Sequence, residues 1–165
     1  MSVAAAELSV DRPQAARAIV WGGLLAGLGD ITFAFVVWRS LGPVRVLQSV
    51  ASGLLGAAAR EGGLATAALG AVLHFTIAFI WATVFWLASR RLKVLVRHPV
   101  VCGLLYGVVI YVFMYFVVLP LSAIHANLPH DASAILLNSA GHMLLIGLPI
   151  ALAASKFSND TGRER

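Results

Sequence analysis

Asp30 lies near the middle of an apolar stretch, Trp21–Trp38, that is long enough to cross a membrane. An ionisable residue at the centre of a bilayer costs about 2.5–3.5 kcal/mol on insertion scales, so it marks either a buried polar contact or a functional site. Two further apolar stretches each contain one histidine, His74 and His142. A carboxylate with two imidazoles suits proton transfer, metal binding or haem ligation.

These polar side chains are expected to share one depth in the membrane. A helix rises about 1.5 Å per residue. Asp30 lies a few residues after the midpoint of its stretch, whereas His74 and His142 lie a few residues before the midpoints of theirs, which cross the membrane in the opposite direction. Three more polar residues fall in that half of the bilayer: Asn138, Tyr111 and Tyr115. The sequence therefore predicts a polar layer slightly to one side of the bilayer centre.

Three interpretations of this layer remain open. In the first, the polar residues only pack the bundle, each contact between helices contributing on the order of 1 kcal/mol. In the second, Asp30 and the histidines form a buried proton relay, since histidine titrates near neutral pH. In the third, the two histidines bind haem b, or join Asp30 around a divalent metal. No phosphate-binding loop, nucleophile elbow or zinc-protease motif occurs, so we assign no catalytic residue and do not expect an enzyme.

A second polar group lies between the last two apolar stretches. It contains His125, His130 and Asp131. These residues could bind a divalent cation loosely or respond to pH. A simple solvated loop is the favoured interpretation.

The composition identifies an integral membrane protein. Of 165 residues, 60% are hydrophobic and 12% are charged, against about a quarter charged in soluble domains. The net charge of +5 is not accompanied by a basic patch interleaved with aromatic residues, so nucleic acid is not an expected partner. Basic residues of a membrane protein instead fix its topology and contact anionic lipid, and the expected partner is the bilayer.

The apolar stretches predict an all-α fold of one domain with four transmembrane helices. These cover about residues 17–38, 64–89, 99–119 and 133–155. A polar N-terminal arm, 1–16, and a polar tail, 156–165, flank the domain. Residues 44–60 are apolar at helical spacing but too short to span, which indicates an interfacial or re-entrant helix.

The distribution of Lys and Arg predicts the topology. Placing the loop at 90–98 in the cytoplasm also places both termini there, and that side then carries nine basic residues against three on the other. The positive-inside rule therefore predicts a multi-pass protein with cytoplasmic N and C termini.

The two halves of the chain resemble each other. Gly23–Gly27 (GLLAG) matches Gly103–Gly107 (GLLYG) after a shift of 80 residues, and His74 matches His142 after a shift of 68. Two helices per unit would make this a parallel 2+2 repeat. The glycine pairs are typical of close helix packing, either within the bundle or in a homo-oligomer.

The chain resembles the YagU-like family of bacterial inner-membrane proteins over most of residues 18–155. The features that carry the resemblance are the Gly-rich first span, LHFTIAF around His74, the basic loop RRLKVLVRHP, Gly103–Gly107 and the pair Gly141–His142. The segment 44–60 departs from the family in being rich in Ala and Gly. The resemblance implies an inner-membrane protein of unknown molecular activity that is linked to acid resistance, and it supplies no catalytic residues.

Overall fold

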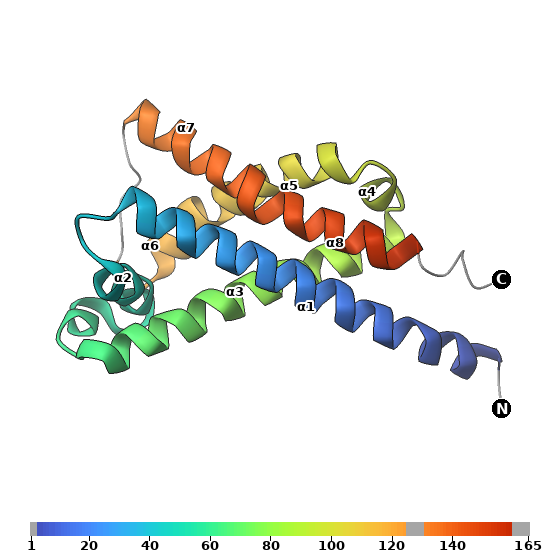
Figure 1. Cartoon of the computed structure of the whole chain (residues 1–165), viewed down its shortest axis with the longest axis horizontal. Coiled ribbons are helices and arrows are strands. Elements are labelled where there is room, and N and C mark those ends of the chain that lie inside the picture. Colours follow the sequence, from blue (N-terminus) through green and yellow to red (C-terminus); the bar gives the residue numbers. More distant parts are fainter. Residues whose placement is uncertain (1–2, 125–130, 160–165) are drawn as a thin grey trace.

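The computed structural model describes residues 3–124 and 131–159, and all regular structure within them is helical (Figure 1). The elements are α1 (Val3–Val37), α2 (Pro43–Leu55), η1 (Gly56–Arg60), α3 (Gly63–Arg91), α4 (Val94–Arg97), α5 (Pro99–Phe113), η2 (Met114–Val118), α6 (Leu119–Leu121), α7 (Ala132–Gly141), η3 (His142–Gly147) and α8 (Leu148–Asn159).

Four helical stretches are long and apolar enough to cross a membrane, which confirms the predicted all-α membrane fold. They cover Pro13–Val37, Gly63–Arg91, Pro99–Leu121 and Ala132–Ser158. The third stretch combines α5, η2 and α6, and the fourth combines α7, η3 and α8. The N-terminal residues that were expected to form an arm continue α1, which begins at Val3.

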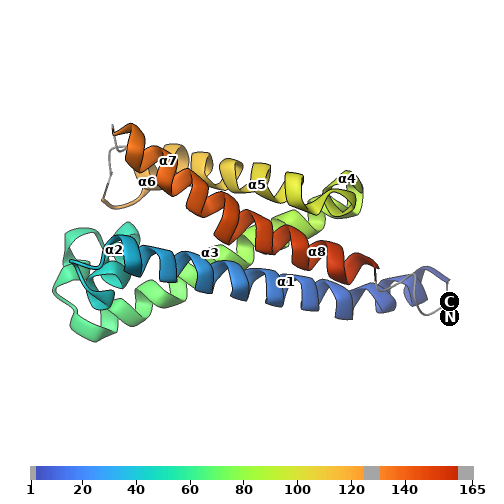
Figure 2. The ribbon, with the colours of Figure 1, turned by 45° about the horizontal axis from the view of Figure 1, so that its top comes forward.

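The four long helices pack into one bundle. Helix α1 packs against α3 and against α8, and α5 packs against η3 and α8. Figure 2 shows α5 and α7–α8 lying over α1 and α3. Between α3 and α5 the contact is made by side chains: Tyr106 donates a hydrogen bond of 2.8 Å to the carbonyl of Trp81, and their rings pack edge to face. The backbones of α3 and α5 are therefore spaced apart by aromatic rings.

The glycine pairs face neighbours within the same chain. A Cβ at Gly107 would collide with the backbone of η3 at His142 and Met143, so α5 and η3 touch backbone to backbone. A Cβ at Gly27 would instead lie 2.7 Å from the ring of Phe75 on α3. Both glycine faces are thus occupied inside the bundle, and a homo-oligomer would have to use other faces.

Two π-helical segments, η2 and η3, interrupt the last two spans. Each ends within two residues of a proline, Pro120 or Pro149. Leu148, which precedes Pro149, donates its N–H to Met143, five residues back. A proline ring clashes with the carbonyl four residues earlier, and a wider turn relieves this clash. In the fourth span the π turn that begins at His142 therefore accommodates Pro149.

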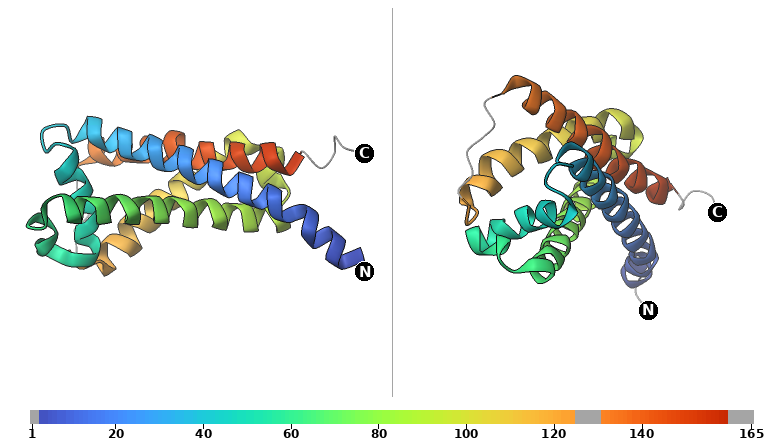
Figure 3. Two further views of the ribbon diagram at one scale, coloured as in Figure 1. Left: turned by 60° about the horizontal axis from the view of Figure 1, so that its bottom comes forward. Right: turned by 60° about the vertical axis from the view of Figure 1, so that its left-hand side comes forward.

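The segment that includes residues 44–60 forms α2 and η1. These two elements lie beside α3, at the end of the bundle opposite to the start of α1 and the end of α8 (Figure 3). The buried amide of Gln48 donates to the carbonyl of Gly63 at 3.0 Å and approaches the Thr66 hydroxyl at 3.2 Å. The N–H of Ala123 donates to the carbonyl of Gly53 at 2.9 Å. Helix α2 therefore joins α3 to the end of the third span.

Candidate functional site

A cavity of about 180 Å³ lies between the long helices and α2. It contains three of the residues that were predicted to share one depth: Asp30 from α1, His74 from α3 and His142 from η3. The remaining wall is mostly apolar. It is formed by Ala26, Gly27, Val50, Ile77, Ala78, Trp81, Ile110, Met114 and Ile146.

The cavity wall contains residues that correspond in the two halves of the chain. His74 and Ala78 correspond to His142 and Ile146 after the shift of 68 residues, and all four line the cavity. Asp30 corresponds to Ile110, which also lines it. A parallel repeat predicts this arrangement around a shared axis. At this position the two halves differ in chemistry, because a carboxylate in the first half corresponds to an apolar side chain in the second.

Asp30 and His74 approach each other across α1 and α3. The Nδ1 of His74 lies 3.9 Å from the Oδ2 of Asp30. The side chains are 25% exposed for Asp30 and 12% exposed for His74. The prediction of a buried cluster is therefore corrected, because these side chains are only partly buried beside the cavity. The separation exceeds that of a direct hydrogen bond.

The other ring nitrogen of His74 is held by the backbone. Its Nε2 lies 2.8 Å from the carbonyl oxygen of Gly27. A carbonyl only accepts, so Nε2 must carry the proton and donate it. The missing side chain of Gly27 lets α3 approach this carbonyl. In neutral His74, Nδ1 therefore presents its lone pair towards Asp30.

In His142 the donor and acceptor nitrogens are the reverse of those in His74. Its Nδ1 lies 2.9 Å from the carbonyl of Asn138, one turn earlier in the same helix. By the same reasoning Nδ1 donates, and Nε2 holds the lone pair. Asn138 itself donates to the carbonyl of Ala134 at 2.7 Å. This hydrogen bond stays within α7.

Tyr111 and Tyr115 pack beside His142. The ring centres of the two tyrosines are 4.4 Å apart, and that of Tyr111 lies 5.4 Å from the His142 ring. The two tyrosine rings therefore form an aromatic wall beside His142.

The cavity contains the carboxylate and imidazole groups that a metal site would need, but these groups do not converge on one point. Among the side chains that the structure describes, no group of three from His, Cys, Asp and Glu is arranged to hold an ion. A haem or metal ligand set stays a prediction. His142 is the first residue of the wide turn η3, and sequence spacing does not report such a turn.

The loop group is only partly described. His125 and His130 lie outside the described residues. Asp131 is exposed and caps α7, because its carboxylate accepts hydrogen bonds from the hydroxyl and the N–H of Ser133. The Ser133 hydroxyl is the main reason that the pKa of Asp131 lies below its ordinary value. This residue has a structural role at a helix end.

Several groups that line the cavity were assigned no role at the site from the sequence. These are the carbonyl of Gly27 and the side chains of Trp81 and Met114. Met114 begins η2, as His142 begins η3. A proline six or seven residues further along the helix is the one sequence signal that could have indicated these wide turns.

The chain was compared with protein-family models, curated proteins and solved structures, and none of them matches it. The resemblance to the YagU-like family therefore remains an expectation.

Proposed function

We propose that this membrane protein takes up protons at Asp30 and His74 and passes them through the cavity as a proton relay with His142. The observation that carries the proposal is the pairing of His74. Its Nε2–H is committed to Gly27, so Nδ1 is the nitrogen that can exchange a proton with Asp30. The neutral pair holds one proton between these two atoms, either on the carboxyl or on the imidazole.

The size of the cavity supports transfer through water. A buried water needs only about 10–15 Å³ of such space and two to four polar partners, and the cavity measures about 180 Å³. A water in the cavity that lies to one side of the pair would bridge Nδ1 of His74 and the carboxylate of Asp30, which are 3.9 Å apart. The lone pair at Nε2 of His142 offers a second acceptor on the same cavity.

A neighbouring groove of about 420 Å³ supports access from the α2 end. It shares Val50, Ile77 and Met114 with the cavity. Ser49 and Ser122 line the same groove. Met114 has three rotatable side-chain bonds and adapts readily, which suits a gate between the groove and the cavity.

Towards the opposite end the bundle is densely packed. Phe85, Ile110 and Ile150 are buried there in one apolar cluster. This layer would have to open for a proton to cross, so we expect slow transfer rather than channel-like conduction. If the α2 end faces outwards, as the positive-inside rule predicts, protons would enter from the acidic side, which fits a role in acid tolerance.

Proteoliposomes with an internal pH dye test the relay. After an acid pulse, the wild type should acidify the interior faster than empty liposomes, and Asp30→Asn should fall to the background rate. Glu61→Gln is the matched control, because it makes the same change at an exposed site outside the cavity wall. Equal rates for the wild type and Asp30→Asn would contradict the relay.

A purely structural role is the second candidate. It is favoured by the contact of His74 with Gly27, which ties α3 to α1 through one hydrogen bond. In that case Asp30→Asn and His74→Gln would lower stability in detergent, while the wild type would carry protons no faster than empty liposomes.

A further inference from the structure

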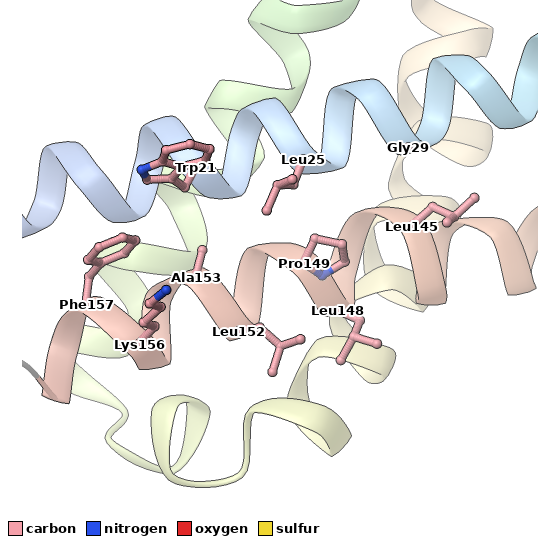
Figure 4. Close-up of a pocket in the computed structure, with 10 residues that line it drawn as sticks. All are labelled: Trp21, Leu25, Gly29, Leu145, Leu148, Pro149, Leu152, Ala153, Lys156 and Phe157. Atoms are coloured by element: carbon pink, nitrogen blue, oxygen red, sulfur yellow. The ribbon is translucent and has the colours of Figure 1, made fainter.

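A long apolar groove of about 620 Å³ lies on the surface of the bundle between α1 and α8 (Figure 4). At one end it is lined by Trp21, Phe157 and Lys156, and at the other by Gly29 and Leu145. Lys156 is the one charged residue in its wall. The groove is separate from the cavity around His74, since the two share no lining residue.

The length of the groove matches one leaflet of a bilayer. From Trp21 to Gly29 the helix rises about 12 Å, and from Leu145 to Lys156 about 16 Å, at about 1.5 Å per residue. Half of the hydrocarbon core measures about 15 Å. An acyl chain that starts beside Lys156 would therefore end near the bilayer centre, at Gly29.

The charge at the Lys156 end of the groove suits an anionic headgroup. The ammonium of Lys156 lies 5.9 Å from the ring centre of Phe157, and no carboxylate pairs with it among the described side chains. Arg17 is exposed one turn before Trp21. The loop after α3 also lies at this end but contributes no residue to the groove wall, because Ser155 donates to the carbonyl of Val96 at 2.8 Å and the wall is formed by α1, η3 and α8.

We propose that a phospholipid binds here, with an acyl chain in the groove and its phosphate on Lys156. The indole N–H of Trp21 is a second donor at that end. A second copy of the chain is a poorer occupant. A twofold interface in the membrane would place like elements of the two copies together, and Lys156 would then lie in an apolar contact close to its own equivalent.

Native mass spectrometry of the detergent-purified protein, with phosphatidylglycerol as the probe, tests this proposal. We expect Lys156→Gln to bind the lipid about fivefold more weakly, the effect of about one basic residue at an anionic membrane surface. Lys93→Gln is the matched control. It removes an exposed lysine at the same end but outside the groove, and it should bind as the wild type does.

A second pair of variants tests the groove itself. Leu25→Trp would fill the groove, and Leu105→Trp makes the same change at an exposed site on α5. We expect lipid to be lost from the first variant and retained by the second. Equal binding by Lys156→Gln and Lys93→Gln would overturn the proposal, whatever the folding of the tryptophan variants. A dimer that dissociates in Leu25→Trp while lipid stays bound would identify a second copy as the occupant and would also overturn it.

Discussion

His74 lies between a backbone carbonyl and a carboxylate: its Nε2 is 2.8 Å from the oxygen of Gly27 and its Nδ1 is 3.9 Å from Asp30. The first contact is a hydrogen bond between helices. The second leaves a gap that a small side-chain movement or a water molecule would close. One imidazole thus holds α3 against α1 and also presents a titratable nitrogen to an acidic group inside the membrane domain.

The two cavity histidines should be opposite tautomers when neutral. His74 donates from Nε2 to Gly27, and His142 donates from Nδ1 to Asn138. In protein labelled with ¹⁵N-histidine, the nitrogen NMR shifts of these two of the five histidines should therefore show one neutral ring of each kind. His74→Gln and His142→Gln assign the signals. Finding both rings as the same tautomer would contradict the hydrogen bonds described above.

Removing His74 should destabilise the protein more than removing His142. The His74 bond joins two helices, and bonds of this kind average about 0.6 kcal/mol, with a maximum near 1.7. The His142 bond lies within one helix, and a transmembrane helix keeps such bonds when the bundle comes apart. Unfolding of His74→Phe and His142→Phe in mixed detergent micelles measures the difference. A larger loss for His142→Phe would show that its contacts with Tyr111 dominate instead.

Gly107→Ala should destabilise the bundle, by about 1–3 kcal/mol for overpacking. The added methyl group would collide with the backbone of η3 at His142 and Met143, which cannot rotate away. Gly53→Ala is the matched control, since its Cβ would have only Ser122 nearby, at 3.9 Å. There the better helix propensity of alanine should stabilise α2 by up to about 1 kcal/mol. Thermal unfolding in one detergent compares the two, and equal effects would be inconsistent with the close approach at Gly107.

The cap of α7 should weaken only in acid. Hydrogen bonds from Ser133 hold the pKa of Asp131 below its ordinary value of about 3.9. The stabilisation is therefore fully present above about pH 4 and is lost as the pH falls through the lower pKa of the folded state. The amide resonance of Ser133 should titrate below pH 4 in the wild type and stay constant in Asp131→Asn. A midpoint above pH 4 would contradict the cap.

The sequence by itself determined the membrane class, the four spans and the close packing of the glycine pairs. Hydrophobic runs of about 20 residues leave few alternatives in a bilayer, because backbone polar groups must be paired within the helix. The corresponding positions of His74 and His142 also indicated two related halves, and these positions meet at one cavity.

Only the tertiary structure decided what each polar group contacts. Depth along a helix follows from residue number, but the direction of a side chain depends on how the helices are rotated and where they widen. His142 begins the π turn η3, and its ring donates back to Asn138 in the same span. His74 lies in a regular helix and instead donates to the carbonyl of Gly27 on another helix. The two histidines therefore differ in their hydrogen-bond partners, which their matching positions in the sequence did not indicate.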